Sequence, residues 1–157
     1  MFASVIKKAN GIVENFSGLL LAVMVIVVFA QVIFRFVLEK PLPWSEEVAR
    51  YIMVWITFLG AALAVKKMAH PRVEVFVNLL PGKIRFSVHI LAIVLSCLFY
   101  TVIIYYGSMF VTSSMMQPSA VMRIPMGLVY MVIPISGLLL ILNSLAQIQN
   151  FNSDKRG

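Results

Sequence analysis

Long uncharged runs alternate along the chain with short segments that hold nearly all of its charged residues. The uncharged runs cover residues 15–34, 51–65, 86–122 and 127–148. A helix needs about 20 predominantly apolar residues to span a bilayer. The pattern therefore predicts one all-α membrane domain, with spans over about 15–38, 45–66, 86–112 and 126–149.

Local signals place the ends of these spans. Ser45 is a good N-cap residue for the second helix, and the acidic pair after it suits the positive end of a helix dipole. The third run is too long for one helix, and the polar cluster at 112–114, followed by Pro118, predicts its end. The first run exceeds the apolar core of a signal peptide and is interpreted as a retained helix.

Composition agrees with a membrane protein, since 61% of the 157 residues are hydrophobic and 12% are charged. Such values exclude a disordered chain and a soluble enzyme. Cys97 is the single cysteine. The chain therefore lacks an internal disulfide and the thiol groups of a Cys-based metal site.

The net charge of +7 is interpreted as a topology signal rather than as nucleic-acid binding. Nine basic residues fall on one side of the predicted spans and four on the other. The nine are Lys7, Lys8, Lys66, Lys67, Arg72, Lys83, Arg85, Lys155 and Arg156; the four are Arg35, Lys40, Arg50 and Arg123. The positive-inside rule then predicts that both termini and the middle loop are cytoplasmic.

The middle loop carries His70 and Glu74, and the apolar spacing at 73–80 favours a short interfacial helix. An alternation at 73, 75 and 77 also fits a strand, but a lone strand has no partner. His70 and His89 both lie near the cytoplasmic side. They keep open an alternative function, a haem-binding membrane anchor of a redox enzyme.

The charged residues of the outer segments fit two roles: they cap and anchor the second helix, or they contact a partner. Glu46 and Glu47 open the second helix, and Arg50 can pair with either one. Trp44 suits the membrane interface. Arg35 either snorkels outward or pairs with Glu46 or Glu47. No nucleophile or metal-type cluster accompanies the carboxylates, so contact with a partner is favoured over catalysis.

Within the spans, small and aromatic residues indicate packing. Gly60 and Ala64 form a small-xxx-small face, and Trp55 lies in mid-span as a packing residue. Pro134, with Gly137 nearby, predicts a tolerated kink. No ionisable residue lies in the middle of any span. Because such residues mark ion and substrate pathways, the chain is predicted to be a scaffold rather than a transport site.

Three segments in order resemble the small membrane subunit of tripartite ATP-independent periplasmic (TRAP) transporters. They are Trp44-Ser45-Glu46-Glu47 continuing through Arg50-Tyr51, Trp55, Phe58 and Gly60; His70-Pro71-Arg72-Val73-Glu74 with Leu80-Pro81 and Arg85; and Pro118-Ser119-Ala120 continuing through Ile124-Pro125, Tyr130, Pro134 and Gly137. The resemblance covers nearly the whole chain. Pro71 departs from the aliphatic residue that is commoner in the family.

This resemblance implies a multi-pass protein of the bacterial inner membrane that is not an enzyme. It implies two protein partners, a large membrane subunit and a periplasmic substrate-binding protein, together with membrane lipids. The complex would import an organic acid, such as a C4-dicarboxylate or sialic acid, with a sodium gradient. Substrate and Na⁺ would bind in the large subunit, leaving this chain without a cofactor. Lys40, Glu46, Glu47, Arg50 and Arg123 are then candidates for docking the binding protein or shaping the outer loops. Arg35, Trp44, Trp55, Gly60, Ala64, Pro134 and Gly137 are candidates for helix packing or the partner interface.

Overall fold

The computed structural model describes residues 2–67 and 82–154, and these residues are almost entirely helical. The helices are α1 (Phe2–Phe36), α2 (Pro43–Lys67), α4 (Gly82–Ser114), α5 (Met126–Tyr130) and α6 (Val132–Asp154). Four segments of the described chain are long and apolar enough to cross a membrane: Ile6–Phe36, Pro43–Val65, Ile90–Ser114 and Met126–Ala146. The predicted all-α fold with four spans is confirmed. The predicted interfacial helix, with His70 and Glu74, lies outside the described residues.

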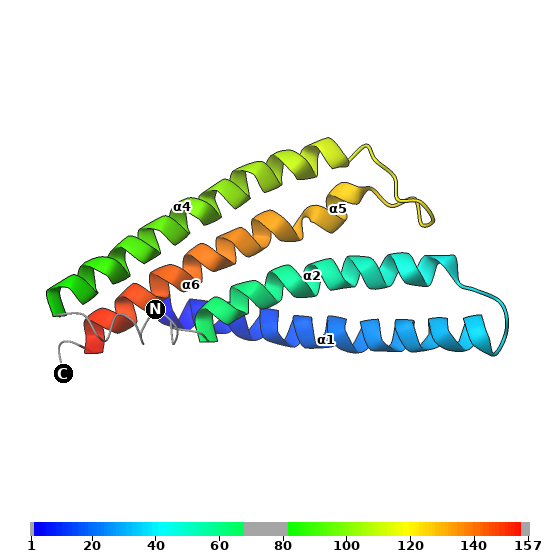
Figure 1. Ribbon diagram of the computed structural model, residues 1–157, viewed down its shortest axis with the longest axis horizontal. Helices are drawn as coiled ribbons and strands as arrows, with labels where there is room; N and C mark the ends of the chain where they lie inside the picture. Colours follow the sequence, from blue (N-terminus) through cyan, green and yellow to red (C-terminus); the bar gives the residue numbers. More distant parts are fainter. Residues whose placement is uncertain (1, 68–81, 155–157) are drawn as a thin grey trace.

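The helices lie side by side in the order α1, α2, α6, α4 (Figure 1). Helix α6 packs along both α2 and α4, while α1 packs mainly against α2. The segments 37–42 and 115–125 lie at one end of the bundle, which we call the loop end. Helix α1 starts, and α6 finishes, at the opposite end. This arrangement brings two loops that are far apart in sequence to one end of the molecule.

Many large apolar side chains of the spans face outward, above all those on α1 and α4. Leu19, Ile26 and Phe29 of α1 are exposed, as are Leu98 and Phe99 of α4. A soluble protein rarely exposes such continuous apolar surface. A hydrocarbon solvent removes the free-energy cost of exposing apolar surface to water, so the exposed faces fit lipid or another membrane protein.

Glycines allow α4 and the α5–α6 segment to approach closely. A Cβ atom on Gly137 would lie 2.7 Å from Ile104 Cγ1, and one on Gly107 would lie 2.8 Å from Ile133 Cγ2. At Gly127 the added Cβ would be 2.7 Å from the backbone oxygen of Val111. In a membrane, where the hydrophobic effect does not drive helices together, van der Waals contacts at such glycines hold neighbouring helices against one another.

A buried amide pair joins three helices near the end opposite the loop end. Asn10 Nδ2 donates to Asn143 Oδ1 at 2.6 Å, and Asn143 Nδ2 donates back to Asn10 Oδ1 at 3.1 Å. Asn143 Nδ2 also donates to the Ala62 carbonyl at 2.9 Å. The two side chains are only 2% and 3% exposed. The pair therefore fixes α1, α2 and α6 relative to one another.

The start of α2 differs from the prediction. The helix begins at Pro43, and Ser45 lies inside the first turn, where its hydroxyl donates to the Leu42 carbonyl at 2.7 Å. The prediction of Ser45 as N-cap is therefore wrong. Proline suits the first helical position because its fixed φ is already helical and no N–H is needed there.

The fourth span is interrupted where the sequence suggested a kink. Helix α5 ends at Tyr130 and α6 begins at Val132, with Met131 between them in helical conformation. Pro134 lacks an N–H and so cannot bond the carbonyl four residues earlier, which is that of Tyr130. The interruption therefore falls one turn before the proline.

Candidate functional site

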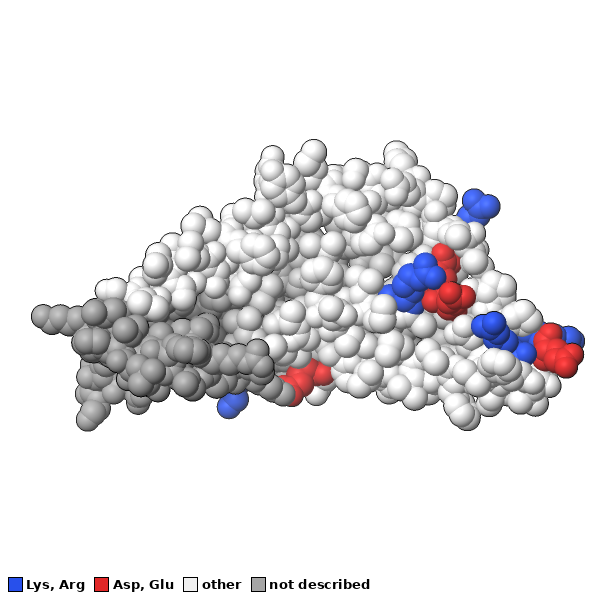
Figure 2. All heavy atoms as spheres, in the orientation of Figure 1, with Lys and Arg blue, Asp and Glu red and all other residues white. Residues whose placement is uncertain are grey.

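Charged side chains gather at the loop end of the visible face, and further charge appears only at its lower edge toward the opposite end (Figure 2). The sequence agrees, because no Asp, Glu, Lys or Arg falls in the four runs at 15–34, 51–65, 86–122 and 127–148. The residues that start α2 and form the two loops are therefore the candidate functional site.

The first loop turns tightly after α1. The amide of Lys40 donates to the Phe34 carbonyl at 2.9 Å, and Glu39 has a positive φ of 53°. The Arg35 guanidinium lies 5.7 Å from the centre of the Phe36 ring. Among residues 2–67 and 82–154, Arg35 forms no ion pair with Glu46 or Glu47. Of the two roles that the sequence left open for Arg35, the structure therefore does not show pairing with Glu46 or Glu47.

Glu46 and Glu47 are neighbours in sequence but face different surroundings. Glu46 points to solvent and pairs with Arg50 at 3.4 Å across one helical turn. Both partners are about two-thirds exposed, at 68% and 65%. Exposed pairs of this type contribute only about 0.3–0.5 kcal/mol.

Glu47 instead holds the second loop. Its Oε2 accepts a hydrogen bond from the Met122 amide at 2.8 Å, and its Oε1 accepts one from the Tyr51 hydroxyl at 2.7 Å. The Val121 amide is 3.5 Å from the same Oε1. The Tyr51 oxygen also lies 3.4 Å from the Met126 sulfur. We call these contacts the Glu47 latch, because they fasten residues 121–126 to the first turns of α2.

The latched loop is a short hairpin, residues 115–125. The Ser119 amide donates to the Ile124 carbonyl at 2.8 Å, and the Met126 amide donates to the Gln117 carbonyl at 2.9 Å. Pro118 and Pro125 face one another as an antiparallel bridge. The buried Ser119 hydroxyl accepts a further bond from the Ile124 amide at 3.2 Å. The hairpin backbone is therefore fixed by bonds of its own as well as by Glu47.

Arg123 occupies a strained position in this hairpin. Its φ is 57°, in the left-handed region that costs a non-glycine residue about 1–2 kcal/mol. Its side chain is exposed and has no ion pair within the described chain. Strain of this kind persists where surrounding bonds fix the backbone, and it clusters at functional sites.

We expect Glu47→Ala to loosen the hairpin and Glu46→Ala to leave it unchanged. Glu47→Ala removes the carboxylate that accepts hydrogen bonds from Tyr51, Val121 and Met122, whereas Glu46→Ala removes one exposed ion pair. A spin label on Cys at Ala120, which is exposed, reports the difference through its mobility. Equal mobility in the two variants would contradict a latch at Glu47.

The remaining candidates lie along the helices. Trp55 packs edge-to-face on Phe16, with ring centroids 6.2 Å apart, and Trp44 is exposed near the loop end. A Cβ on Gly60 would meet nothing within 4 Å, and Ala64 is exposed. The small-xxx-small face thus packs against no described helix of this chain and stays a candidate partner interface. Gly107 and Gly127 were not among the predicted packing residues, because nothing in the local sequence distinguishes them from exposed glycines.

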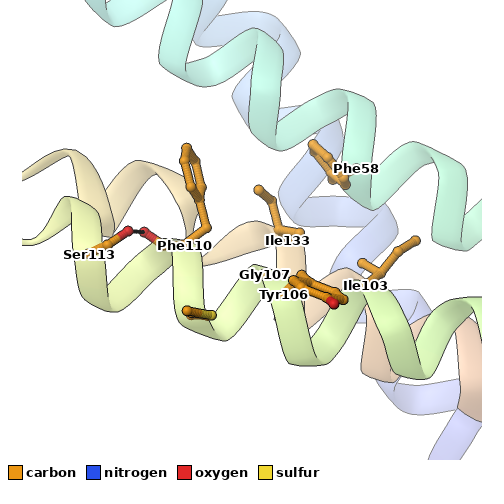
Figure 3. Close-up of a pocket in the computed structure, with 8 residues that line it drawn as sticks. Phe58, Ile103, Tyr106, Gly107, Phe110, Ser113 and Ile133 are labelled. Carbon is orange, nitrogen blue, oxygen red and sulfur yellow. Dashed lines mark hydrogen bonds between the residues drawn. The ribbon is translucent and has the colours of Figure 1, made fainter.

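An apolar groove opens between α2 and α4, with α6 behind it (Figure 3). Its volume is about 710 Å³. Phe58 comes from α2 and Ile133 from α6, while the other lining residues, among them Ile103, Tyr106 and Phe110, come from α4. The groove lies within the membrane-spanning part of the chain and carries no charged group.

Comparison with known families decides the identity. The family model for "Tripartite ATP-independent periplasmic transporters, DctQ component" matches residues 24–151. The chain belongs to this TRAP transporter family. It is therefore a DctQ-type component of a TRAP transporter and, with its four candidate spans, a multi-pass protein of the bacterial inner membrane.

Individual relatives agree with this assignment. The C4-dicarboxylate TRAP transporter small permease protein DctQ of Vibrio cholerae is 27% identical over 68% of this chain and 46% of its own length. The sialic acid TRAP transporter small permease protein SiaQ of the same organism is 35% identical over 52% of this chain and 47% of its own length. The sialic acid TRAP transporter permease protein SiaT of Haemophilus influenzae is 37% identical over 50% of this chain, but the match covers only 13% of that protein. The aligned part of the chain thus spans about half or less of the length of these relatives.

These relatives give no support to the haem-anchor alternative. His70 and the side chain of His89 lie outside what the structure describes. Among the described residues, no three His, Cys, Asp or Glu side chains gather in a way that could hold a metal ion.

Proposed function

We propose that this TRAP small permease subunit is the static scaffold for a larger membrane subunit in a sodium-coupled importer of an organic acid. The observation that carries the proposal is the uncharged middle of all four spans. Intramembrane ionisable residues mark ion and substrate pathways, and this subunit has none there. Substrate and Na⁺ would therefore be bound by the larger subunit.

The names of relatives support a larger partner and an acidic substrate. Two relatives are named permease protein without the word small. They are SiaT and the isethionate TRAP transporter permease protein DctMQ of Oleidesulfovibrio alaskensis. The matched segment is only 13% and 15% of these two proteins, so a related segment there belongs to a much longer chain. The named substrates include sialic acid, C4-dicarboxylates and isethionate, all of them organic acids. We propose an organic acid of this kind here.

We further propose that the loop end faces the periplasm and docks a soluble substrate-binding protein. Nine of the thirteen basic residues belong to the predicted cytoplasmic side, and Lys7 and Lys8 stand at the end opposite the loop end. Basic residues near span ends favour the cytoplasmic side. Lys40, Glu46, Arg50 and Arg123 would then be available to a periplasmic partner, with Glu47 shaping the hairpin.

Reconstitution tests this function. The tagged chain should co-purify with a second, much larger membrane protein. In liposomes, uptake of a labelled organic acid should require both membrane subunits, a purified periplasmic binding protein and an inward sodium gradient. A subunit that is isolated alone, together with uptake that is unchanged without it, would refute the scaffold role. Uptake without a sodium gradient would refute the coupling only.

A further inference from the structure

The tip of the 115–125 hairpin exposes apolar side chains outside the membrane spans. Met116 is 92% exposed, and Val121 and Met122 are 48% and 44% exposed. The candidate spans on either side end at Ser114 and begin again at Met126, so this apolar tip lies outside both spans. Exposed apolar groups on a loop outside the spans indicate an interaction site.

A cation accompanies this apolar tip. Arg123 follows Met122 directly, is exposed and has no acidic partner within the described chain. The nearby carboxylate of Glu47 accepts hydrogen bonds from the backbone of residues 121 and 122 and from Tyr51. Arg123 is therefore free to pair with a carboxylate on another molecule.

The backbone of the hairpin is also preorganised in the absence of a partner. Two main-chain hydrogen bonds close it, the Ser119 hydroxyl braces it, and the Glu47 latch fixes it to α2. A contact segment that is already ordered loses little entropy on association, so more of its contact energy appears as affinity.

We propose that this hairpin is the part of the subunit that contacts the periplasmic binding protein. Met116, Val121 and Met122 would enter an apolar hollow of that protein, and Arg123 would pair with a carboxylate at the rim of the hollow. The proposal rests on the proposed function and narrows its docking surface from the whole loop end to one hairpin.

A lipid headgroup is the other chemistry that an exposed cation with apolar neighbours can meet. Segments that anchor at the interface are enriched in Trp and Tyr. Residues 115–125 contain no aromatic side chain, whereas Trp44 stands at the start of α2. Together with the fixed backbone, this favours a protein partner, and the experiment below includes lipid as an outcome.

Site-specific photocrosslinking in the complete membrane complex tests the contact. A benzoylphenylalanine replaces Val121 in the hairpin, Leu38 in the first loop, or Phe99 on the exposed face of α4. The purified binding protein that supports uptake is then added. An adduct with the binding protein is expected from Val121 and none from Phe99. Adducts of Val121 with lipid alone, or an adduct from Leu38 but not from Val121, overturn the proposal.

Affinity measurements test the role of Arg123 separately from its backbone. Arg123→Asn removes the charge but tolerates the left-handed conformation, so the hairpin should keep its shape. We expect the binding protein to bind the complex about fivefold more weakly, as for loss of one exposed charge contact. Arg123→Lys should recover most of the affinity, and Lys8→Asn at the opposite end should change nothing.

Two results overturn the Arg123 assignment. The first is unchanged affinity in Arg123→Asn, and the second is a larger loss in Lys40→Asn than in Arg123→Asn. If uptake by the unmodified complex needs no binding protein, the proposed function fails and the hairpin contact fails with it. If uptake needs the protein but Val121 gives no adduct with it and Arg123→Asn leaves its affinity unchanged, only the hairpin contact fails.

Discussion

Replacing Asn143 with alanine is expected to lower the free energy of unfolding of this subunit by about 1–3 kcal/mol. The change removes three hydrogen bonds that connect α6 to α1 and α2. It leaves the Asn10 amide, which is 2% exposed, without its partner in the core, and an unpaired buried amide is costly. Unfolding in mixed micelles, followed through the fluorescence of Trp55, measures the loss.

A double-mutant cycle separates the amide pair from general packing loss. Asn10→Ala leaves Asn143 with only its hydrogen bond to the Ala62 carbonyl, whereas in the double variant neither amide remains in the core. The double variant should therefore lose less stability than the sum of the two single variants, by about 0.5–3 kcal/mol. Thr101→Ala serves as the control, because this exposed hydroxyl bonds only within α4, to the Cys97 carbonyl. Strict additivity of the two losses would argue against a coupled pair.

Gly137→Leu is expected to separate α6 from α4 and to destabilise the subunit by about 1–3 kcal/mol. Its Cβ alone would lie 2.7 Å from Ile104 Cγ1, so the rest of a leucine side chain has no room unless the helices move. A lower unfolding temperature of the purified subunit in detergent is the measurement. An unchanged temperature would show that this helix contact is looser than the structure has it.

Gly60→Leu is the matched control for Gly137→Leu. It makes the same substitution in a membrane helix, but at a glycine whose added Cβ would meet nothing within 4 Å. The stability of the isolated subunit should therefore stay the same. Any loss of the proposed large subunit from Gly60→Leu preparations would then report on contact with that partner and not on folding of this chain.

The spans were predictable from sequence because a bilayer imposes one simple length requirement. Each spanning helix needs about 20 apolar residues, and in this sequence those stretches contain no charged residue in their middle. The ends of the spans were less certain. Helix α2 begins at Pro43 instead of Ser45, because proline fits the first helical position and the serine hydroxyl returns to the carbonyl of Leu42.

Packing between the spans was only partly predictable. Gly137 was a packing candidate on the strength of its neighbour Pro134, and it does lie against α4. Gly60 and Ala64 had the stronger small-residue pattern, yet no described helix of the chain covers them. A small-residue spacing permits close approach, but it does not say which helix, or which protein, approaches.

The sequence by itself determined the number of spans, the absence of a charged pathway within them and the gathering of charge near their ends. These properties depend on local composition, because the length and polarity of a single segment decide whether it can cross a bilayer. Only the tertiary structure separated Glu46 from Glu47. The two side chains diverge by about 100° around α2, so one reaches solvent and the other reaches a hairpin about 75 residues away in sequence. It likewise paired Asn10 with Asn143, 133 residues apart. Contacts over such separations depend on how whole helices are placed, and no local pattern in the sequence records that placement.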